Sequence, residues 1–386
     1  MMKVLYVNDN LRLPAGITMV IKNIIDNCQS SDIEFSILTI ESDRNNALGY
    51  FQGQGVRIYY MPGTTTTSTN NRFKRLVAKV NIFSLFKIRR FFLNFFRENS
   101  FDVVHSHFAQ IDKLMFPVAK NSGVKCCISH SHSSKLSESY IRAIRNKIIC
   151  NGLIDIADYC AACSDKAGIA LFGKRFLDSN KRLIINNGIR VPEFKYNDLA
   201  RVEIRRRYNI PADTFVIGHV GRLNKVKNQS FLIDVFSILD AKVTGKYVLM
   251  LVGSGECEVD LKNKVKKNGL EGRVIFAGAQ TDIASYLCAF DIFVMPSLHE
   301  GLGIAAIEAQ ATGLECILST TIPSDVNLTD IVFLSINDIP AKWAEQIIKM
   351  PKERHLDYNQ KVLEAGYDIN DVCANLCQFY MSISQS

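Results

Sequence analysis

The sequence lacks several features that define other classes of protein. It has no apolar run long enough to cross a membrane, and its first residues, MMKVLYVND, read as a strand rather than a signal peptide. It also lacks an Asp-x-Asp element, an acidic pair that could hold a divalent ion. The first two absences predict a cytoplasmic protein, and the third is consistent with a protein that needs no bound metal or other cofactor.

The cysteines do not form the pattern of a disulfide framework or a zinc site. There are eleven, an odd number in irregular positions, which fits reduced thiols. Cys160 and Cys163 make a C-x-x-C pair, but no second pair completes a zinc site. Their strand-like surroundings indicate buried packing instead.

Acidic residues are missing from one long part of the chain, since none occurs between Arg44 and Arg97. Within it, Arg72–Arg97 combines many Phe, Leu and Ile with only positive charges. Such a helix is typical of an interfacial membrane segment, or of a core helix whose Lys and Arg solvate its outer face. Both interpretations stay open, and the first predicts docking of residues 72–97 on an anionic membrane. The side chains that would meet the membrane are Phe91, Phe92, Phe95, Phe96, Lys87, Arg89 and Arg90.

The composition is that of a folded protein with two domains. The 386 residues exceed what one compact core usually holds, and 47% of them are apolar while 22% are charged. The net charge of +8 is uneven, because residues 1–195 carry the excess of Lys and Arg and the remainder is slightly acidic. A basic first half suggests an anionic partner for that half. We expect no nucleic-acid partner.

Strand-like runs alternate with helix-like segments in the first half of the chain. This alternation predicts a parallel sheet with helices on both faces, and such sheets bind ligands beyond the carboxyl ends of their strands. The runs are Val4–Val7, Ile33–Ile40, Val56–Tyr60, Val103–Ser106 and Cys126–Ser129.

The most informative stretch is Phe293–Gly313, FVMPSLHEGLGIAAIEAQATG. It predicts a buried strand, a turn opened by Pro296, and a helix from about Gly303. Backbone N–H groups at such a helix start favour an anion. Glu300 precedes the helix and Glu308 lies on its first turns. A carboxylate at that second position would repel phosphate but accept hydrogen bonds from a sugar diol.

The spacing from Glu300 to Glu308 resembles the E-x7-E element of retaining glycosyltransferases of family 4, which have the GT-B fold. The resemblance extends over PSLHEGLGIAAIEAQATGLECILST. It implies that Glu308 holds the ribose hydroxyls of a nucleotide and that Glu300 lies beside the donor sugar. The backbone implied to contact the sugar and the distal phosphate is that of Gly301, Leu302, Gly303 and Ile304.

A second element resembles the same family. Gly221–Asn228, GRLNKVKN, is similar to a G-R-L-x3-K-N element whose Arg and Lys clamp the donor diphosphate. The resemblance implies this role for Arg222 and Lys227. Arg can hold phosphate oxygens through two parallel hydrogen bonds, and Lys supplies a compact charge. The later G-x-G pair, Gly253 and Gly255, fits a ligand loop or close helix packing equally well.

Histidines stand at the ends of two predicted strands, Phe101–His107 and Val124–Ser134. The second segment resembles the family's acceptor-side histidine loop, which implies that His130, or secondly His132, faces the donor sugar. We expect no zinc site here, because no acidic or cysteine ligands accompany these two histidines and zinc takes three or four ligands.

Two further donor contacts are implied by position. Family members have two glycines in the loop after the first strand, close to the donor phosphate. This chain has Ala15 and Gly16 there, so only Gly16 keeps the pattern. Gln280 lies in a loop where the family binds the nucleotide base, and it is chosen by position alone.

The resemblance implies an α/β protein of the GT-B fold, with two facing Rossmann-like parallel-sheet domains and the active site in the cleft between them. Residues 1–195 would form the N-terminal acceptor domain and residues 196–368 the nucleotide-sugar domain. A C-terminal helix within 369–386 would pack back on the first domain.

The implied activity is retaining transfer of a sugar from a nucleotide-sugar donor, UDP-linked, in bacterial surface-polysaccharide biosynthesis. The acceptor would be a glycan or a polyprenyl-diphosphate-linked glycan, reached from the inner face of the cell membrane. Arg222, Lys227 and the helix start at Leu302–Gly303 would stabilise the departing diphosphate without a metal. The alternatives are a GT-B sugar-nucleotide epimerase and a non-catalytic GT-B partner subunit.

Overall fold

The chain forms two compact units, the first made of residues 1–188 and 369–386 and the second of residues 189–368. The computed structural model describes residues 1–12, 16–28, 30–40, 47–61, 82–137, 139–243, 247–351 and 353–383, with backbone alone for 82–84. Ile189 pairs with Asp368 in a parallel bridge, so the chain enters and leaves the second unit side by side. The second unit therefore begins at Ile189, seven residues before the boundary at residues 195 and 196 that was predicted from the sequence.

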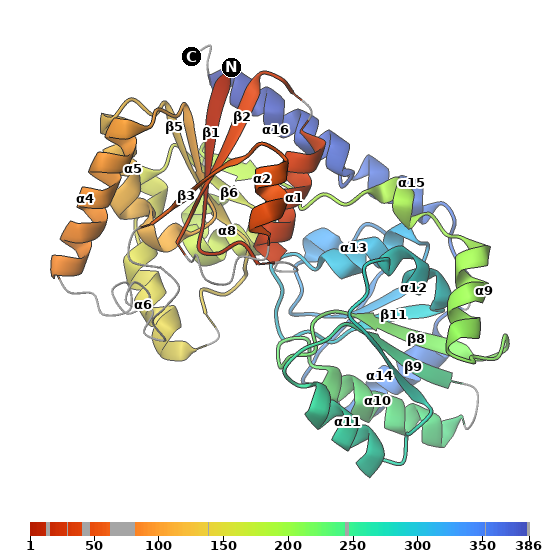
Figure 1. The fold of residues 1–386 in the computed structure, drawn as a ribbon. Helices are drawn as coiled ribbons and strands as arrows, with labels where there is room; N and C mark the ends of the chain where they lie inside the picture. The colour runs from red at the N-terminus through yellow and green to blue at the C-terminus, as the bar shows by residue number, and fades with distance from the viewer. Residues whose placement is uncertain are drawn as a thin grey trace. The chain divides into compact units, whose positions relative to one another are not determined.

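The first unit is built on a seven-stranded sheet in the order β3-β2-β1-β4-β5-β6-β7, in which every neighbouring pair is parallel (Figure 1). The five strand-like runs predicted from the sequence are confirmed as β1 to β5. The strands are β1 Met2–Asn8, β2 Ile33–Thr39, β3 Arg57–Tyr60, β4 Val103–Ser106, β5 Cys126–Ser131, β6 Tyr159–Ala162 and β7 Arg182–Ile184.

Helices cover this sheet, and one of them comes from the far end of the chain. The C-terminal helix α16 (Ile369–Ile383) and α1 (Gly16–Asn27) share one apolar core with the sheet, in which Tyr6, Ile24 and Val372 are buried. The remaining helices are α2 Leu48–Gly53, α4 Ile82–Glu98, α5 Asp112–Asn121, α6 Tyr140–Cys150, α7 Leu153–Ile156 and α8 Asp165–Phe172, with short 3-10 turns at Ala109–Ile111 and Lys174–Phe176. Ser164 caps α8 by accepting a hydrogen bond from the Ala167 N–H at 3.1 Å.

A disulfide bond joins Cys28, just after α1, to Cys377 on α16. The expectation of reduced thiols is wrong for this pair, which is 349 residues apart in the chain and cannot be recognised from spacing. The other nine cysteines form no disulfide bond among the described residues, and Cys160 and Cys163 are buried as the packing interpretation predicted.

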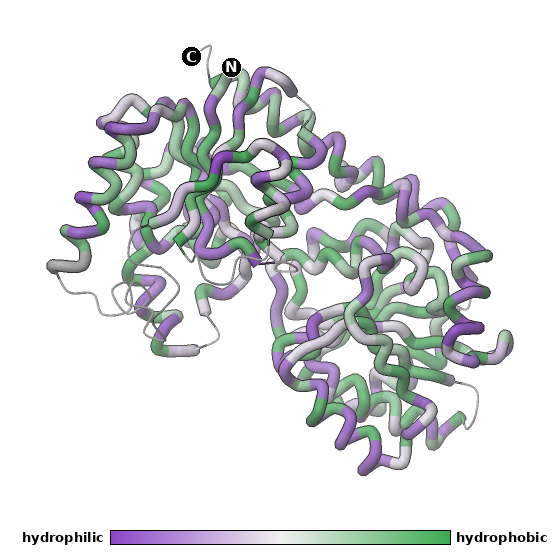
Figure 2. Tube along the Cα trace, viewed as in Figure 1, coloured by the Kyte–Doolittle hydropathy of each residue, from purple (hydrophilic) through white to green (hydrophobic). Residues whose placement is uncertain are grey.

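The second unit has a six-stranded parallel sheet in the order β10-β9-β8-β11-β12-β13. Its strands are β8 Phe215–Val220, β9 Tyr247–Val252, β10 Val274–Gly278, β11 Ile292–Met295, β12 Cys316–Ser319 and β13 Val332–Leu334. Its helices are α9 Asp198–Arg207, α10 Gln229–Lys242, α11 Glu258–Lys267, α12 Ile283–Ala289, α13 Ile304–Ala311, α14 Pro340–Lys349 and α15 Tyr358–Glu364, with 3-10 turns at Val191–Phe194 and Ser324–Val326. In both units the strands are largely apolar (Figure 2).

Helix α4 packs into the first unit through its phenylalanines. Phe92, Phe95 and Phe96 are buried, and the Phe95 ring centroid lies 5.1 Å from that of Tyr59 on β3. This corrects the membrane interpretation for these side chains and supports the core alternative, in which Lys87, Arg89 and Arg90 are left exposed. The burial follows because phenylalanines three and four residues apart share the helix face that meets the sheet. Residues 72–81 of the predicted segment lie outside the described residues.

No helix in the described ranges has both the length and the apolarity needed to cross a membrane.

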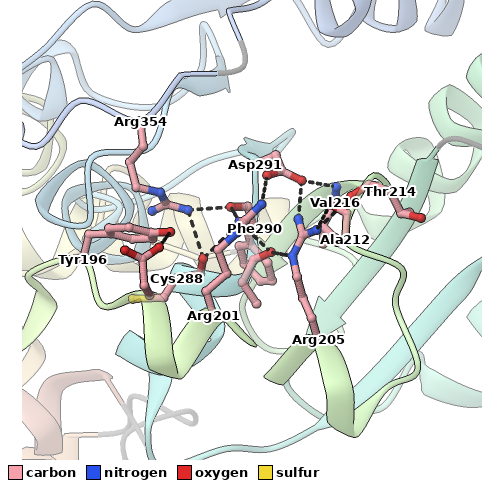
Figure 3. Close-up of polar contacts among 12 residues, drawn as sticks. Tyr196, Arg201, Arg205, Ala212, Thr214, Val216, Cys288, Phe290, Asp291 and Arg354 are labelled. Carbon is pink, nitrogen blue, oxygen red and sulfur yellow. Dashed lines mark hydrogen bonds and ion pairs between the residues drawn. The ribbon is translucent and has the colours of Figure 1, made fainter. Parts of the chain in front are cut away.

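Three arginines surround one aspartate at the amino end of β11 (Figure 3). Asp291 accepts hydrogen bonds from Arg201 at 2.6 Å, from Arg205 at 2.5 Å and from the Val216 N–H at 2.6 Å. Arg205 also donates to the carbonyl of Ala289, in the last turn of α12. The third arginine, Arg354, lines a cavity of about 140 Å³ beside Asp291.

These three arginines lie at the C-terminal end of α12, where the helix dipole is negative and favours positive charge. Arg354 donates to the carbonyls of Leu287, Cys288 and Phe290 there. Burial lowers the pKa of Arg354 to about 10 and also lowers that of Arg205. This cluster therefore holds α9, α12 and the segment around Arg354 together.

Candidate functional site

The turn between β11 and α13 depends on one glycine. Gly303 is the residue just before α13 and has φ 103°, in the left-handed region that favours glycine. A Cβ there would lie 3.3 Å from Met295 Cε and 3.4 Å from Ile322 Cγ2. The local prediction of strand, glycine-containing turn and helix is thus confirmed, with the helix beginning at Ile304.

The loops that follow β8 and β11 are tied together because these two strands are neighbours in the sheet. The Leu298 N–H donates to the Val226 carbonyl at 2.7 Å, and Asn228 Nδ2 donates to the Pro296 carbonyl at 3.2 Å. Both loops lie at the carboxyl edge of the sheet, where parallel sheets bind ligands.

Lys227 and Glu300 meet across these loops. Lys227 Nζ lies 2.7 Å from Glu300 Oε1, and the two side chains are only 20% and 12% exposed. Asn224 Oδ1 accepts a hydrogen bond from the Lys227 N–H at 3.0 Å, which fixes the backbone of the loop. The structure thus brings together two residues that the sequence analysis assigned to one site.

Glu308 belongs to the same group of charges. Burial raises the pKa of its carboxyl group to about 7, and the positive charge of Lys227 opposes this rise. The half-buried side chain lies one helical turn into α13. Lys227 therefore acts on two carboxylates, Glu300 by direct contact and Glu308 through its field.

Arg222 is placed differently from Lys227. It is exposed and forms an ion pair with Glu256, with Arg222 Nη2 3.0 Å from Glu256 Oε2. The two members of the predicted clamp thus share a loop but have different partners in the structure.

His219 and Gln229 support this loop, and sequence reasoning missed both. His219 Nδ1 lies 2.9 Å from the Val294 carbonyl, which can only accept, so Nδ1 carries the proton. Burial lowers the His219 pKa to about 4 and keeps the ring neutral. Gln229 Nε2 can then donate to His219 Nε2 at 3.2 Å and to the Arg222 carbonyl at 2.9 Å. The available signal was a histidine inside the apolar strand FVIGHV.

The glycines of the G-x-G pair allow two backbones to approach. A Cβ on Gly253 would lie 2.1 Å from the Gly221 carbonyl oxygen, and one on Gly255 would lie 2.3 Å from the Leu223 carbonyl oxygen. The Leu223 N–H also donates to the Ser254 carbonyl at 2.9 Å. These glycines therefore let the loop after β9 support the loop that carries Arg222 and Lys227.

The other two predicted donor contacts, Gln280 and Gly16, belong to the second and the first unit respectively. Gln280 Nε2 donates to the carbonyl of Ala277 at 2.5 Å, so its amide is turned to its own strand end. Gly16 is exposed at the start of α1, with nothing within 4 Å of a Cβ built on it. Ala15 lies outside the described residues.

Four histidines gather at the carboxyl ends of β4 and β5 in the first unit. His105 Nε2 lies 3.0 Å from His130 Nδ1, and His107 Nδ1 lies 2.6 Å from His132 Nε2. His105 Nδ1 in turn lies 2.6 Å from the hydroxyl of Tyr380 on α16. This grouping arises because β4 and β5 are parallel neighbours.

Burial lowers the pKa of every histidine in this cluster, to about 3 for His105 and about 4 for His132. His107 and His130 have pKa values well below the usual range, for the same reason. Each ring is therefore neutral and carries one proton. The direction of the hydrogen bonds from Tyr380 through His105 decides whether His130 Nε2 is a donor or an acceptor.

The histidine cluster is larger than the pair that the sequence pattern indicated. His130 is not limited to His132 as a neighbour, because nitrogen atoms of His105, His107 and His130 all lie within 4.8 Å of one another. Both nitrogens of His105 are already bonded, to Tyr380 and to His130. The cluster is therefore an array of hydrogen-bonded rings. Within it, the buried Nε2 atoms of His107 and His130 have no hydrogen-bond partner among the described residues.

Known proteins with the same architecture define the class of fold. The chain superposes on HepE of Anabaena, solved in complex with UDP, with a TM-score of 0.74 at 17% identity, covering 99% of this chain and 100% of HepE. The two parallel sheets and this likeness identify the fold as GT-B.

Similarity in sequence identifies the class of protein. Residues 200–367 match the family model described as glycosyl transferases group 1. The chain is 28% identical to EpsF of Bacillus subtilis (strain 168) over 392 residues, covering 98% of this chain and 96% of EpsF. It is 25% identical over 316 residues to the UDP-Gal:alpha-D-GlcNAc-diphosphoundecaprenol alpha-1,3-galactosyltransferase of Escherichia coli, covering 79% and 78% of the two chains. The protein is a glycosyltransferase with the GT-B fold.

Proposed function

We propose that this protein is a retaining glycosyltransferase of family 4 that transfers a sugar from a UDP-linked donor in surface-polysaccharide biosynthesis. Its acceptor is a glycan or a polyprenyl-diphosphate-linked glycan, and it works in the cytoplasm. The observation that carries the proposal is the group formed by Lys227, Glu300 and Glu308 at the carboxyl edge of the second sheet. The name of the Escherichia coli relative, which specifies a UDP-sugar and a diphosphoundecaprenol-linked acceptor, supports both substrates.

In this proposal the charges of the second unit act on the donor. Departure of the nucleotide diphosphate builds negative charge on the phosphates. Lys227, Arg222 and the N–H groups at the start of α13 would stabilise that charge, and Lys227 would leave Glu300 to do so. Glu300 would then accept hydrogen bonds from the donor sugar, while Glu308 holds the ribose diol. Gly301, Leu302, Gly303 and Ile304 would contact the sugar and distal phosphate through their backbone.

The remaining proposed contacts come from the first unit and from the loop after β10. His130 would contact the donor sugar through Nε2, the atom that has no partner among the described residues. Gly16 would let the donor phosphate approach the start of α1. Gln280 would have to turn away from the Ala277 carbonyl to reach a nucleotide base.

The test is a screen of nucleotide sugars by thermal shift, followed by mass analysis of products on lipid-linked acceptors. A UDP-sugar that raises the melting temperature and yields a glycosylated lipid with retained anomeric configuration is the expected result. Conversion of donor without any acceptor would instead identify a sugar-nucleotide epimerase. Absence of both donor binding and product would leave a non-catalytic partner subunit.

The proposal also excludes a metal requirement. Transfer should persist in excess EDTA, because Lys227, Arg222 and the α13 dipole supply the positive charge that a divalent ion would otherwise provide. The measurement is product formation with EDTA and after adding back Mg²⁺ or Mn²⁺. Activity that disappears with EDTA and returns with either ion would overturn this mechanism.

Glu308 should make nucleotide binding depend on pH. Its pKa of about 7 means that the carboxyl is protonated below that pH and ionised above it. The ionised form accepts two hydrogen bonds from the ribose diol, so UDP affinity should fall as the pH drops through about 7. Calorimetric titration with UDP on either side of this pH measures the effect. Glu308→Gln is the control, since it removes this titration but leaves the ionisation of UDP itself, and an identical pH profile for both proteins would refute the role.

A further inference from the structure

Helix α6 exposes an unusual number of large apolar side chains. The exposed fractions are 80% for Tyr140, 79% for Ile141, 45% for Ile144 and 69% for Ile148. Single exposed apolar residues are ordinary, but four on one helix of eleven residues form a contiguous patch that needs a reason.

These side chains share the side of α6 that faces away from the first unit. Successive helical residues are about 100° apart, so the four positions fall within an arc of about 100°. The opposite side carries Asn146 and Cys150, which are buried. Asn146 Nδ2 donates to the Leu136 carbonyl at 2.8 Å, which fixes the rotation of the helix. The apolar stripe is therefore held outward.

Basic residues flank this stripe on both sides. On the same helical projection Arg145 lies beyond one edge and Lys147 beyond the other, with Arg142 further round, and α6 contains no acidic residue. An apolar stripe with basic flanks is the pattern of a helix that lies in the plane of a membrane interface, with its cations at the headgroups.

We propose that α6 docks the first unit on an anionic lipid bilayer, with Tyr140, Ile141, Ile144 and Ile148 inserted at the boundary of headgroups and acyl chains. The excess of Lys and Arg over Asp and Glu in residues 1–195 complements an anionic leaflet. A second copy of the chain is a poorer occupant, because a stable dimer buries about 800 Å² on each partner and the stripe is confined to one helix about 16 Å long. This role is separate from α4, whose Phe92, Phe95 and Phe96 are buried in the core.

The test is flotation of the full chain with vesicles of phosphatidylglycerol and phosphatidylcholine, compared with vesicles of phosphatidylcholine alone. The protein should float with the mixed vesicles, less so at high salt, and should stay behind with the neutral ones. No sugar donor or acceptor is present, so the result does not depend on the proposed transferase activity. Equal behaviour with both kinds of vesicle would overturn the proposal.

Two pairs of substitutions localise the effect to α6. Arg142→Gln with Lys147→Gln should weaken binding about fivefold for each charge removed, or about thirtyfold together. The matched control, Lys87→Gln with Arg90→Gln on α4, removes the same charges from exposed positions and should weaken binding much less. If the control pair on α4 loses as much vesicle binding as the pair on α6, the total charge of the protein and not α6 is responsible for binding.

Ile141→Ser with Ile148→Ser tests the apolar stripe. Both side chains are exposed, so the circular dichroism spectrum and melting temperature should not change, while vesicle binding falls more than tenfold as apolar contact with the bilayer is lost. Light scattering on the same samples identifies the competing occupant. Self-association of the unchanged protein that disappears in this variant, with no loss of vesicle binding, would make the stripe a contact between copies.

Discussion

Replacing Lys227 with alanine is expected to lower donor turnover by about one to two orders of magnitude, because one charged contact to phosphate contributes about 1.5–3 kcal/mol. The loss should be large at this position because Lys227 is mostly buried and also neutralises Glu300 and Glu308. Arg222→Ala is expected to lower turnover in the same range if its side chain leaves Glu256 for the diphosphate. Initial rates at saturating and limiting donor measure both variants.

Lys225→Ala is the matched control for Lys227→Ala. It removes the same charge from the same loop, but Lys225 is exposed and should leave the rate nearly unchanged. Circular dichroism should show both variants folded. Full activity in Lys227→Ala would mean that the diphosphate does not bind at this loop.

Replacing Asp291 with alanine is expected to destabilise the second unit by about 3–5 kcal/mol, because it leaves buried arginine charge without its anion. Asp291 accepts hydrogen bonds from Arg201, Arg205 and the Val216 N–H, and the Arg205 side chain is only 7% exposed (Figure 3). For a unit of this size the melting temperature should fall by about 6–20 °C. Thermal unfolding followed by circular dichroism measures the change.

Two further variants separate charge from shape at this position. Asp291→Asn keeps an oxygen acceptor but loses the charge, so its melting temperature should lie between those of Asp291→Ala and the unchanged protein. Glu345→Ala breaks the exposed pair with Lys242 in the same unit and should leave the melting temperature nearly unchanged. If Asp291→Ala melts no lower than Glu345→Ala, the arginines are satisfied by the carbonyls alone.

Much of the local structure could be predicted because it depends on residues close together in the chain. Apolar runs separated by helical patterns predicted the strands β1 to β5, and the composition of Phe293–Gly313 predicted a strand, a turn and a helix. Gly303 was recognisable for the same reason, since its φ of 103° is a local requirement of that turn.

The arrangement of the candidate site could be predicted only in part. The family resemblance assigned Lys227 and Glu300 to one site, and the structure brings them to 2.7 Å although 73 residues separate them. Chemistry alone could not assign Arg222 to Glu256, or show that Gln229 and His219 support the loop. These contacts arise from side-chain directions at strand ends, which a linear pattern does not contain.

By itself, the sequence determined the type of each element and the residue types available for chemistry, because hydrophobic period and turn composition act over a few residues. The tertiary structure decided which face of each helix is buried. It buried Phe92, Phe95 and Phe96 of α4 and left Ile141, Ile144 and Ile148 of α6 exposed, although both helices are basic and apolar in sequence. It also joined Cys28 to Cys377, because the C-terminal helix α16 packs beside α1. It grouped four histidines, because β4 and β5 are neighbours in the sheet although they are separated in sequence.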